Sequence, residues 1–229
     1  MYKRNLPVSI LMVVGILLAA CSSAAQAASA SAKAVPANWT SNTDTSLPVP
    51  ITFSFDPTWI SQDGFNSINI VDPGNPTLPP DQWWGPTIAL VDGAMVHDPA
   101  DIEVNVEPAQ PVAADKTKFI PWPTDFFAYL TALPGVEVVQ KAGNVTIGGV
   151  QGKQIIVMTP KMHPIVWLKG DASWLGGEES GVDPDFERQI ILLNVHGNHL
   201  LLEFDDDPML FPTHSQIVQE IFDSIKFGK

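Results

Sequence analysis

The segment over residues 188–204 constrains the fold most, because its side chains specify a β-hairpin with one apolar face. A turn at Gly197-Asn198, with glycine first as a type II′ turn requires, predicts that His196 lies opposite His199. Side chains alternate along a strand, so one face of the hairpin carries apolar residues alone and must belong to the core. These residues are Ile191, Leu193, Val195, Leu200, Leu202 and Phe204. The other face is mixed, and we expect it to be half covered.

Short strands and two helices account for the rest of the folded part. Alternating or β-branched runs bounded by Gly, Pro or Asp predict strands at 51–55, 65–71, 88–91, 102–106, 136–139, 145–147, 154–158 and 165–168. Residues 124–133 predict a helix that Thr124 caps, and a second helix is predicted over about 214–225 with Thr213 opening a capping box. Because helices do not alternate regularly with strands, the sequence predicts the α+β class with an antiparallel sheet.

Cys21 is the only cysteine and follows a segment typical of a bacterial lipoprotein signal. Lys3 and Arg4 precede an apolar stretch over about 6–18, and small residues lead to the cysteine. That stretch of about 13 residues is shorter than the roughly 20 that a helix needs to cross a bilayer. We therefore expect cleavage after residue 20 and attachment of the Cys21 thiol to lipid, which holds the mature chain on the membrane. A transmembrane anchor and an ordinary secretory signal are the alternatives.

Composition divides the chain into three parts: a cleaved signal peptide over 1–20, a lipidated flexible tether over 21–47 and a single domain over 48–229. The tether is rich in Ala, Ser, Thr and Asn, and such a segment buries too little apolar surface to offset the entropy of ordering. The domain of about 180 residues is long enough for one sizeable core.

The mature chain is expected to be strongly acidic. The full sequence has 12 Lys and Arg against 25 Asp and Glu, for a formal net charge of −13. Cleavage after residue 20 removes two basic residues and no acidic one, which leaves −15. Nucleic acids bind clustered Lys and Arg, so we expect no nucleic-acid partner. With Cys21 joined to lipid, no thiol remains for redox chemistry, a metal or a nucleophile.

Four segments carry a resemblance to a known family: Phe126-Phe127-Ala128-Tyr129-Leu130, the run from Val145 to Lys153, Leu193-Asn194-Val195-His196-Gly197 and the closing run from Asp223 to Phe227. Over roughly 50–229 the chain resembles bacterial envelope lipoproteins and extracytoplasmic domains with a PsbP-like fold. The resemblance implies a twisted antiparallel sheet packed against two main helices and used in binding rather than catalysis. It brings no catalytic residue to this sequence, so we expect neither an enzyme nor a cofactor.

His196 and His199 are the candidate metal ligands, because the predicted register places them side by side. The pair supplies only two ligands, and turn-flanking histidines without a metal are the preferred interpretation. The neighbouring run over 205–207 consists of three Asp and lacks the alternating spacing and glycine of a calcium loop. We interpret it as a solvated strand end.

Four tryptophans are candidate partner-contact residues: Trp83, Trp84, Trp122 and Trp174. All of them fall in or beside loops rich in Pro and Gly, where strand packing does not require a large aromatic residue. Exposed indoles are good anchors for protein partners or glycans. The alternative is that they close the ends of the sheet as part of the core.

Three functions remain open from the sequence. The first is a non-enzymatic binding or interaction module, held by lipidated Cys21 on the extracytoplasmic face of the bacterial cell membrane, or on the outer membrane of a cell with two. Its partner would be an envelope protein or a small ligand. The second is a lipid or small-molecule carrier with a pocket at the hydrophobic face of the hairpin. The third is a metal-assisted hydrolase using His196 and His199, although the sequence contains no Gly-x-Ser-x-Gly elbow, phosphate loop or dinucleotide fingerprint.

Overall fold

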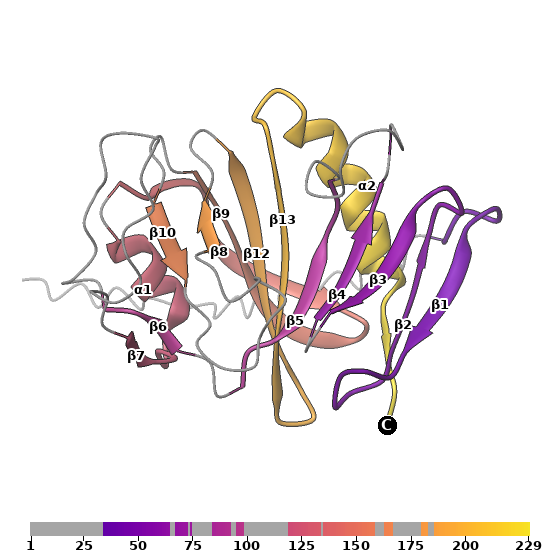
Figure 1. The fold of residues 1–229 in the computed structure, drawn as a ribbon, viewed down its shortest axis with the longest axis horizontal. Coiled ribbons are helices and arrows are strands. Elements are labelled where there is room, and N and C mark those ends of the chain that lie inside the picture. The colour runs from indigo at the N-terminus through magenta and orange to yellow at the C-terminus, as the bar shows by residue number, and fades with distance from the viewer. Residues whose placement is uncertain are drawn as a thin grey trace, which may run out of the picture. The chain divides into compact units, whose positions relative to one another are not determined.

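A seven-stranded antiparallel sheet forms the centre of the domain (Figure 1). The computed structural model describes residues 34–64, 67–72, 74, 84–92, 95–98, 119–133, 135–158, 163–166, 180–182 and 186–229. All of them lie in one compact unit over 32–229. The strand order is β3 (Ile60–Gly64), β4 (Ser67–Val71), β5 (Thr87–Leu90), β13 (Asn198–Asp206), β12 (Glu187–Val195), β9 (Val150–Met158) and β8 (Glu137–Ile147).

Smaller sheets and two helices complete the described elements. A three-stranded sheet has the order β1 (Thr40–Asp44), β2 (Ile51–Phe55) and β14 (Lys226–Phe227). Two further strand pairs are β6 (Met95–His97) with β7 (Phe119–Pro121), and β10 (His163–Val166) with β11 (Ser180–Val182). The helices are α1 (Phe126–Ala132) and α2 (Phe211–Ser224). Within the described ranges, neither helix is long and apolar enough to cross a membrane. These elements confirm the predicted α+β class with an antiparallel sheet and two helices.

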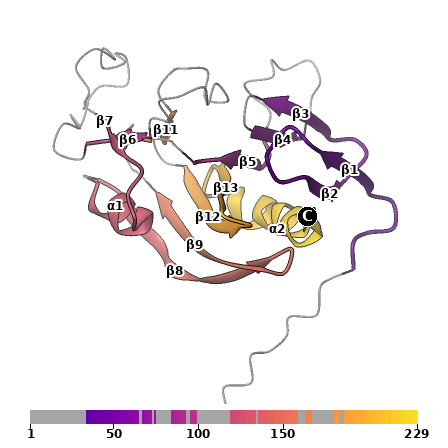
Figure 2. The same ribbon diagram turned by 90° about the horizontal axis from the view of Figure 1, so that it is seen from below.

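The first core lies between α2 and one face of the large sheet. Val218, Ile221 and Phe222 of α2 are fully buried there. The six apolar residues predicted for one face of the hairpin all belong to this core. β2 adds Ile51 and Phe53, and Figure 2 shows α2 enclosed between the hairpin strands and β2. The predicted core face of the hairpin is therefore confirmed.

The second core lies on the opposite face of the sheet, under α1. Phe126, Phe127, Tyr129 and Leu130 of the helix are buried in it together with Ile155, Val157, Ile190 and Leu201 of the sheet. Burial, reinforced by the nearby charge of Asp98, raises the pKa of the Tyr129 phenol. The mixed face of the hairpin is thus half covered, because α1 packs on its apolar positions.

The turn of the hairpin differs from the predicted one. His196 and Gly197 are its two central residues, with φ of 55° and 92°, so both are left-handed as a type I′ turn requires. Val195 pairs with Asn198, and His199 pairs with Asn194 rather than with His196. Asn194 Oδ1 accepts a hydrogen bond from the Gly197 N–H at 3.0 Å, which stabilises this turn. The predicted register was wrong by two residues, and an even shift leaves every side chain on its predicted face.

Both helices begin at residues other than the predicted ones. Asp125 caps α1, because its Oδ1 accepts a hydrogen bond from the Ala128 N–H at 3.0 Å. α2 begins at Phe211, before the predicted start. Pro212 lies in its first turn, where a missing N–H is tolerated. The strands predicted at 136–139 and 145–147 form the single strand β8, and the strand predicted at 102–106 lies outside the described residues.

The predicted boundary at residue 47 between tether and domain was wrong. β1 pairs with β2 along its whole length, and Leu47 is buried in the first core. All five β1 residues are polar and three of them are exposed, so backbone pairing to β2 rather than apolar burial holds the strand. For that reason the amino-acid composition of β1 resembles that of a flexible tether. The domain begins no later than Thr40, and residues 1–33, including Cys21, lie outside the described residues.

Candidate functional site

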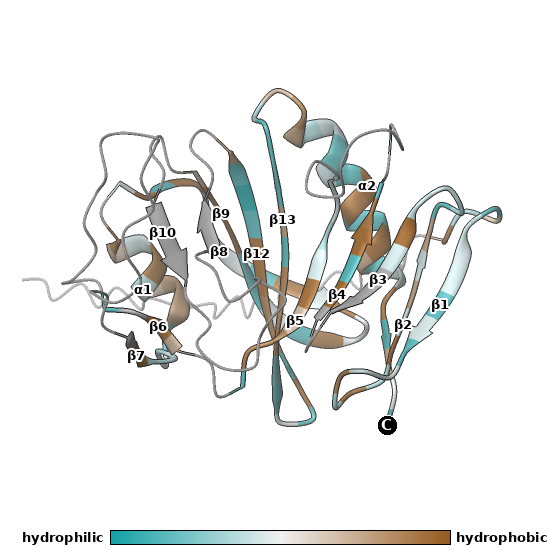
Figure 3. Ribbon diagram, in the orientation of Figure 1, coloured by the Kyte–Doolittle hydropathy of each residue, from teal (hydrophilic) through white to brown (hydrophobic). Residues whose placement is uncertain are grey.

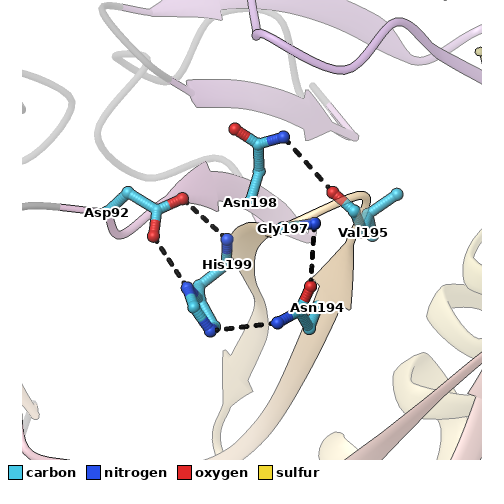
Figure 4. Close-up of polar contacts among 6 residues, drawn as sticks. All are labelled: Asp92, Asn194, Val195, Gly197, Asn198 and His199. Atoms are coloured by element: carbon cyan, nitrogen blue, oxygen red, sulfur yellow. Dashed lines mark hydrogen bonds and ion pairs between the residues drawn. The ribbon is translucent and has the colours of Figure 1, made fainter.

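A polar cluster at the hairpin end is the first place where the structure brings titratable side chains together (Figure 4). Asp92, which follows β5, accepts two hydrogen bonds from His199. Its Oδ2 lies 2.7 Å from the His199 backbone N, and its Oδ1 lies 2.7 Å from Nδ1 of the ring. On the other side of the ring, Asn194 Nδ2 lies 3.3 Å from Nε2.

The Asp92–His199 pair has the geometry by which carboxylates orient histidines in catalytic and metal sites. A proton on Nδ1 is donated to Asp92, and Nε2 then accepts a hydrogen bond from the Asn194 amide. Both ring nitrogens are therefore engaged, and an amide group occupies the position where a nucleophile or metal would lie. The cluster fastens the tip of the hairpin to the end of β5.

The candidate metal pair does not form. His196 occupies the turn, whereas His199 lies in β13 opposite Asn194. The prediction that the two imidazoles lie side by side was wrong, because it depended on the two-residue register error. In the part of the chain that the structure describes, no group of three or more His, Cys, Asp or Glu side chains is arranged to hold a metal ion.

We expect Asp92→Ala to lower the free energy of unfolding by about 1 kcal/mol, because it removes two charge-assisted hydrogen bonds at a half-exposed position. The side chains of Asp92 and His199 are 39% and 53% exposed, which limits the effect. Urea unfolding followed by circular dichroism measures the change. Asp223→Ala is the matched control, because exposed Asp223 accepts a hydrogen bond from Gln219 within the same helix α2. Equal effects of the two substitutions would contradict a fastening role for Asp92.

A second polar cluster is buried on the α1 face of the sheet. Arg188 Nη2 lies 2.9 Å from Asp205 Oδ2, and its Nη1 lies 3.7 Å from Glu203 Oε2. Burial raises the pKa of Glu203, Arg188 acts to lower it, and the nearby charge of Asp205 adds to the rise. The guanidinium thus contacts two carboxylates, of which Glu203 is largely buried and Asp205 is 32% exposed. The alternation of the hairpin predicts Glu203 on the mixed face but does not distinguish Arg188, because the hairpin sequence alone does not show what covers that face.

A third cluster combines aromatic rings with a hydrogen bond between a histidine and a carboxylate at the start of α2. The ring of Trp84 stacks on His214 with centroids 3.8 Å apart, and Trp59 meets Trp84 edge-on at 4.8 Å. His214 Nδ1 lies 2.5 Å from Asp206 Oδ2, and that carboxylate side chain is 8% exposed. The cluster joins three segments that are distant in sequence. Aromatic residues in the Trp84 loop were the only signal that could have found it.

The candidate tryptophans that the structure describes are packed rather than free. Trp84 is half-buried in the third cluster, and Trp122 is half-buried and stacks on Phe126 with centroids 4.4 Å apart. For these two residues the interpretation as core at the ends of the sheet is the better one. Trp83 and Trp174 lie outside the described residues.

The fold and these clusters define an α+β domain with an antiparallel sheet, a helix on each face of it, and histidines held in internal contacts. Among solved structures, it is similar to cyanobacterial PsbP (CyanoP) from Synechocystis sp. PCC 6803, with a TM-score of 0.43, 10% identity, and coverage of 84% of this chain and 94% of that one. It is also similar to LpqN, a protein involved in cell envelope biogenesis of Mycobacterium tuberculosis, with a TM-score of 0.39, 14% identity, and coverage of 83% and 92%. No protein-family model and no curated protein matches the chain.

Proposed function

We propose that the protein is a lipid-anchored, non-enzymatic binding module on the extracytoplasmic face of the bacterial cell membrane. The observation that carries the proposal is that His199, His214 and Glu203 are engaged in internal contacts. His199 is held between Asp92 and Asn194, and His214 lies under Trp84 against Asp206. Glu203 is buried against Arg188. A general acid or base must reach the proton of a bound substrate, whereas these three side chains contact other residues of the domain.

The anchor part of the proposal is supported by the sequence before the domain. The basic start, the short apolar stretch and Cys21 have the order of a lipoprotein signal. The sequence predicts a flexible tether after Cys21, and about 18 such residues, the number between Cys21 and β1, would have a root-mean-square reach of about 20 to 25 Å. The domain would therefore work within a few nanometres of the bilayer, where its acidic surface keeps it off anionic headgroups.

Cys21→Ser is expected to move the full-length chain from the membrane fraction to the soluble fraction, because only the thiol can accept the diacylglycerol group. Fractionation followed by immunoblotting measures the shift, and metabolic labelling with a fatty-acid analogue should label the wild type alone. Ser22→Ala, one residue further on, is the matched control and should remain membrane-bound and labelled. A Cys21→Ser chain that still pellets with carbonate-washed membranes would contradict the lipid anchor.

The binding part is tested by affinity purification of the full-length chain from detergent-solubilised membranes of its own bacterium. We expect one envelope protein to be recovered in constant ratio to the bait, whereas an unrelated lipoprotein with the same tag should not recover it. Failure of any protein to exceed that control would refute the binding module.

The alternative function as a lipid or small-molecule carrier required a pocket in the domain. That pocket was predicted at the hydrophobic face of the hairpin, and this face is filled by α2. Val218, Ile221 and Phe222 are fully buried against it, and Leu202 and Phe204 of the hairpin are fully buried as well. The predicted location of the pocket was therefore wrong.

A further inference from the structure

Two large apolar side chains lie exposed next to each other where β13 connects to α2. Met209 is 89% exposed and Leu210 is 49% exposed. The connection lies at the top of Figure 1, and Figure 3 colours it brown, for hydrophobic residues, where the helix begins. The large hydrophobic residues exposed among the described ones are Val35, Ile60, Val138, Val139, Met209 and Leu210. Met209 is by far the most exposed of them, so this pair is the most accessible apolar contact there.

The backbone of Met209 and Leu210 is fixed by hydrogen bonds. Asp207 Oδ1 accepts from the Met209 N–H at 2.7 Å, and the Asp207 carbonyl accepts from the N–H groups of Leu210 and Phe211 at 2.8 Å each. Phe211 is buried and stacks on Phe204 with ring centroids 5.3 Å apart. The exposed pair is therefore presented on a turn that both Asp207 and the core hold in place. Such pre-organisation reduces the entropy that a contact loses on binding.

The third cluster supports the same turn from the helix side. The His214 N–H donates to the Leu210 carbonyl at 3.0 Å, and the His214 ring is held between Trp84 and Asp206. These contacts leave the side chains of Met209 and Leu210 in solvent while their backbone stays tied to the domain. Exposure of this pair is therefore a property of the folded turn.

The chain around the exposed pair is acidic. Asp207 is exposed and lies two residues before Met209, the sequence has no Lys or Arg between Arg188 and Lys226, and the whole chain has a formal net charge of −13. An anionic bilayer repels such a surface. A protein surface with Lys or Arg around an apolar pocket is complementary to it in both charge and hydrophobicity. Methionine suits this role, because its flexible and polarizable side chain adapts to the shape of a pocket.

We infer that Met209 and Leu210 form the surface by which this domain docks into an apolar pocket flanked by Lys or Arg on a protein partner. The inference rests on the proposed function as a binding module and names the contact surface of that module and the chemistry of its partner.

A photo-crosslinking amino acid at position 209 of the full-length, lipid-anchored chain tests the contact in the bacterium itself. We expect crosslinking to one protein, and mass spectrometry should place the crosslink in a segment where apolar residues are flanked by Lys or Arg. In solubilised membranes the crosslink yield should fall as salt rises from 0.15 M to 1 M, because the Debye length shrinks from about 8 to about 3 Å. Crosslinking mainly to lipid, to a second copy of the chain or to a segment without basic residues would overturn the inference.

The double substitution Met209→Gln and Leu210→Gln should reduce recovery of the affinity-purified partner at least about tenfold, as expected for loss of a central apolar anchor. Both side chains are exposed, so the melting temperature should not change. The matched control is Val138→Gln with Val139→Gln on strand β8, which removes the other exposed apolar pair and should leave recovery unchanged. If the double variant at 209 and 210 recovers the partner as well as the wild type does, Met209 and Leu210 are not the contact surface, but the proposed function as a binding module is still supported. If the wild type recovers no partner, both fail.

Discussion

Gly85→Ala is expected to lower the free energy of unfolding by more than about 3 kcal/mol. Gly85 has φ of 155°, and a Cβ built on it would lie 1.9 Å from the Ile70 carbonyl oxygen and 2.9 Å from the Ile70 carbonyl carbon. The chain cannot move aside there, because hydrogen bonds hold it to β4 on both sides of the glycine. The Ile70 N–H donates to Pro86 O at 3.0 Å, and the Asp72 N–H donates to Trp84 O at 2.8 Å.

Urea unfolding of purified protein measures this loss, which is a large part of the 5 to 15 kcal/mol typical of a whole domain. Gly143→Ala is the matched control. Gly143 lies in edge strand β8, and an added Cβ there would meet no atom within 4 Å. That variant should differ from the wild type by less than about 1 kcal/mol. A Gly85→Ala protein that unfolds at the urea concentration of the wild type would show that β4 and the Trp84 segment are not in contact as described.

Arg188→Met is expected to cost about 3 to 5 kcal/mol at pH 7, because it leaves Glu203 buried without its counter-charge. The side chains of Arg188 and Glu203 are 11% and 15% exposed, so water replaces little of the lost interaction. Methionine keeps much of the apolar length of the arginine, which limits the contribution of lost packing. Urea midpoints of the two proteins at pH 7 measure the cost.

The loss of unfolding free energy caused by Arg188→Met should depend on pH. Burial raises the pKa of Glu203 in the folded protein, and loss of Arg188 removes the group that lowers it. The folded state then keeps a proton that the unfolded state loses near pH 4.3, so stability falls as the pH rises above that value. The penalty of Arg188→Met should therefore be smaller at pH 4 than at pH 7. Glu203→Gln in the same chain should recover most of the loss at pH 7, and a penalty that is equal at both pH values would contradict this account.

Residue alternation explains why the core of the hairpin could be predicted although its turn could not. Glycine satisfies the first position of a type II′ turn and the second position of a type I′ turn, so Gly197 alone does not distinguish the two. The hydrogen bond between Asn194 and the Gly197 N–H decides it, and that bond depends on the folded turn. The two registers differ by two residues, and the apolar face is the same in both.

The remaining errors and omissions involve contacts between distant parts of the chain. β1 has no apolar pattern, and its existence depends on pairing with β2. The stacking of Trp84 on His214 and the burial of Arg188 likewise depend on elements that meet only in the folded domain. Local periodicity predicts which face of an element is buried, but it does not predict which polar side chains meet there.

The central position of β2 in the three-stranded sheet has a consequence for the order of folding. One edge of β2 pairs with β1 near the start of the domain, and the other pairs with β14, two residues from the C-terminus. Ser224 Oγ also accepts a hydrogen bond from the Ser54 N–H at 2.8 Å, across 170 positions of sequence. Contacts of such long range form slowly and only once the whole chain is present. A polypeptide emerging from the ribosome therefore cannot complete this three-stranded sheet before β14 has been synthesised.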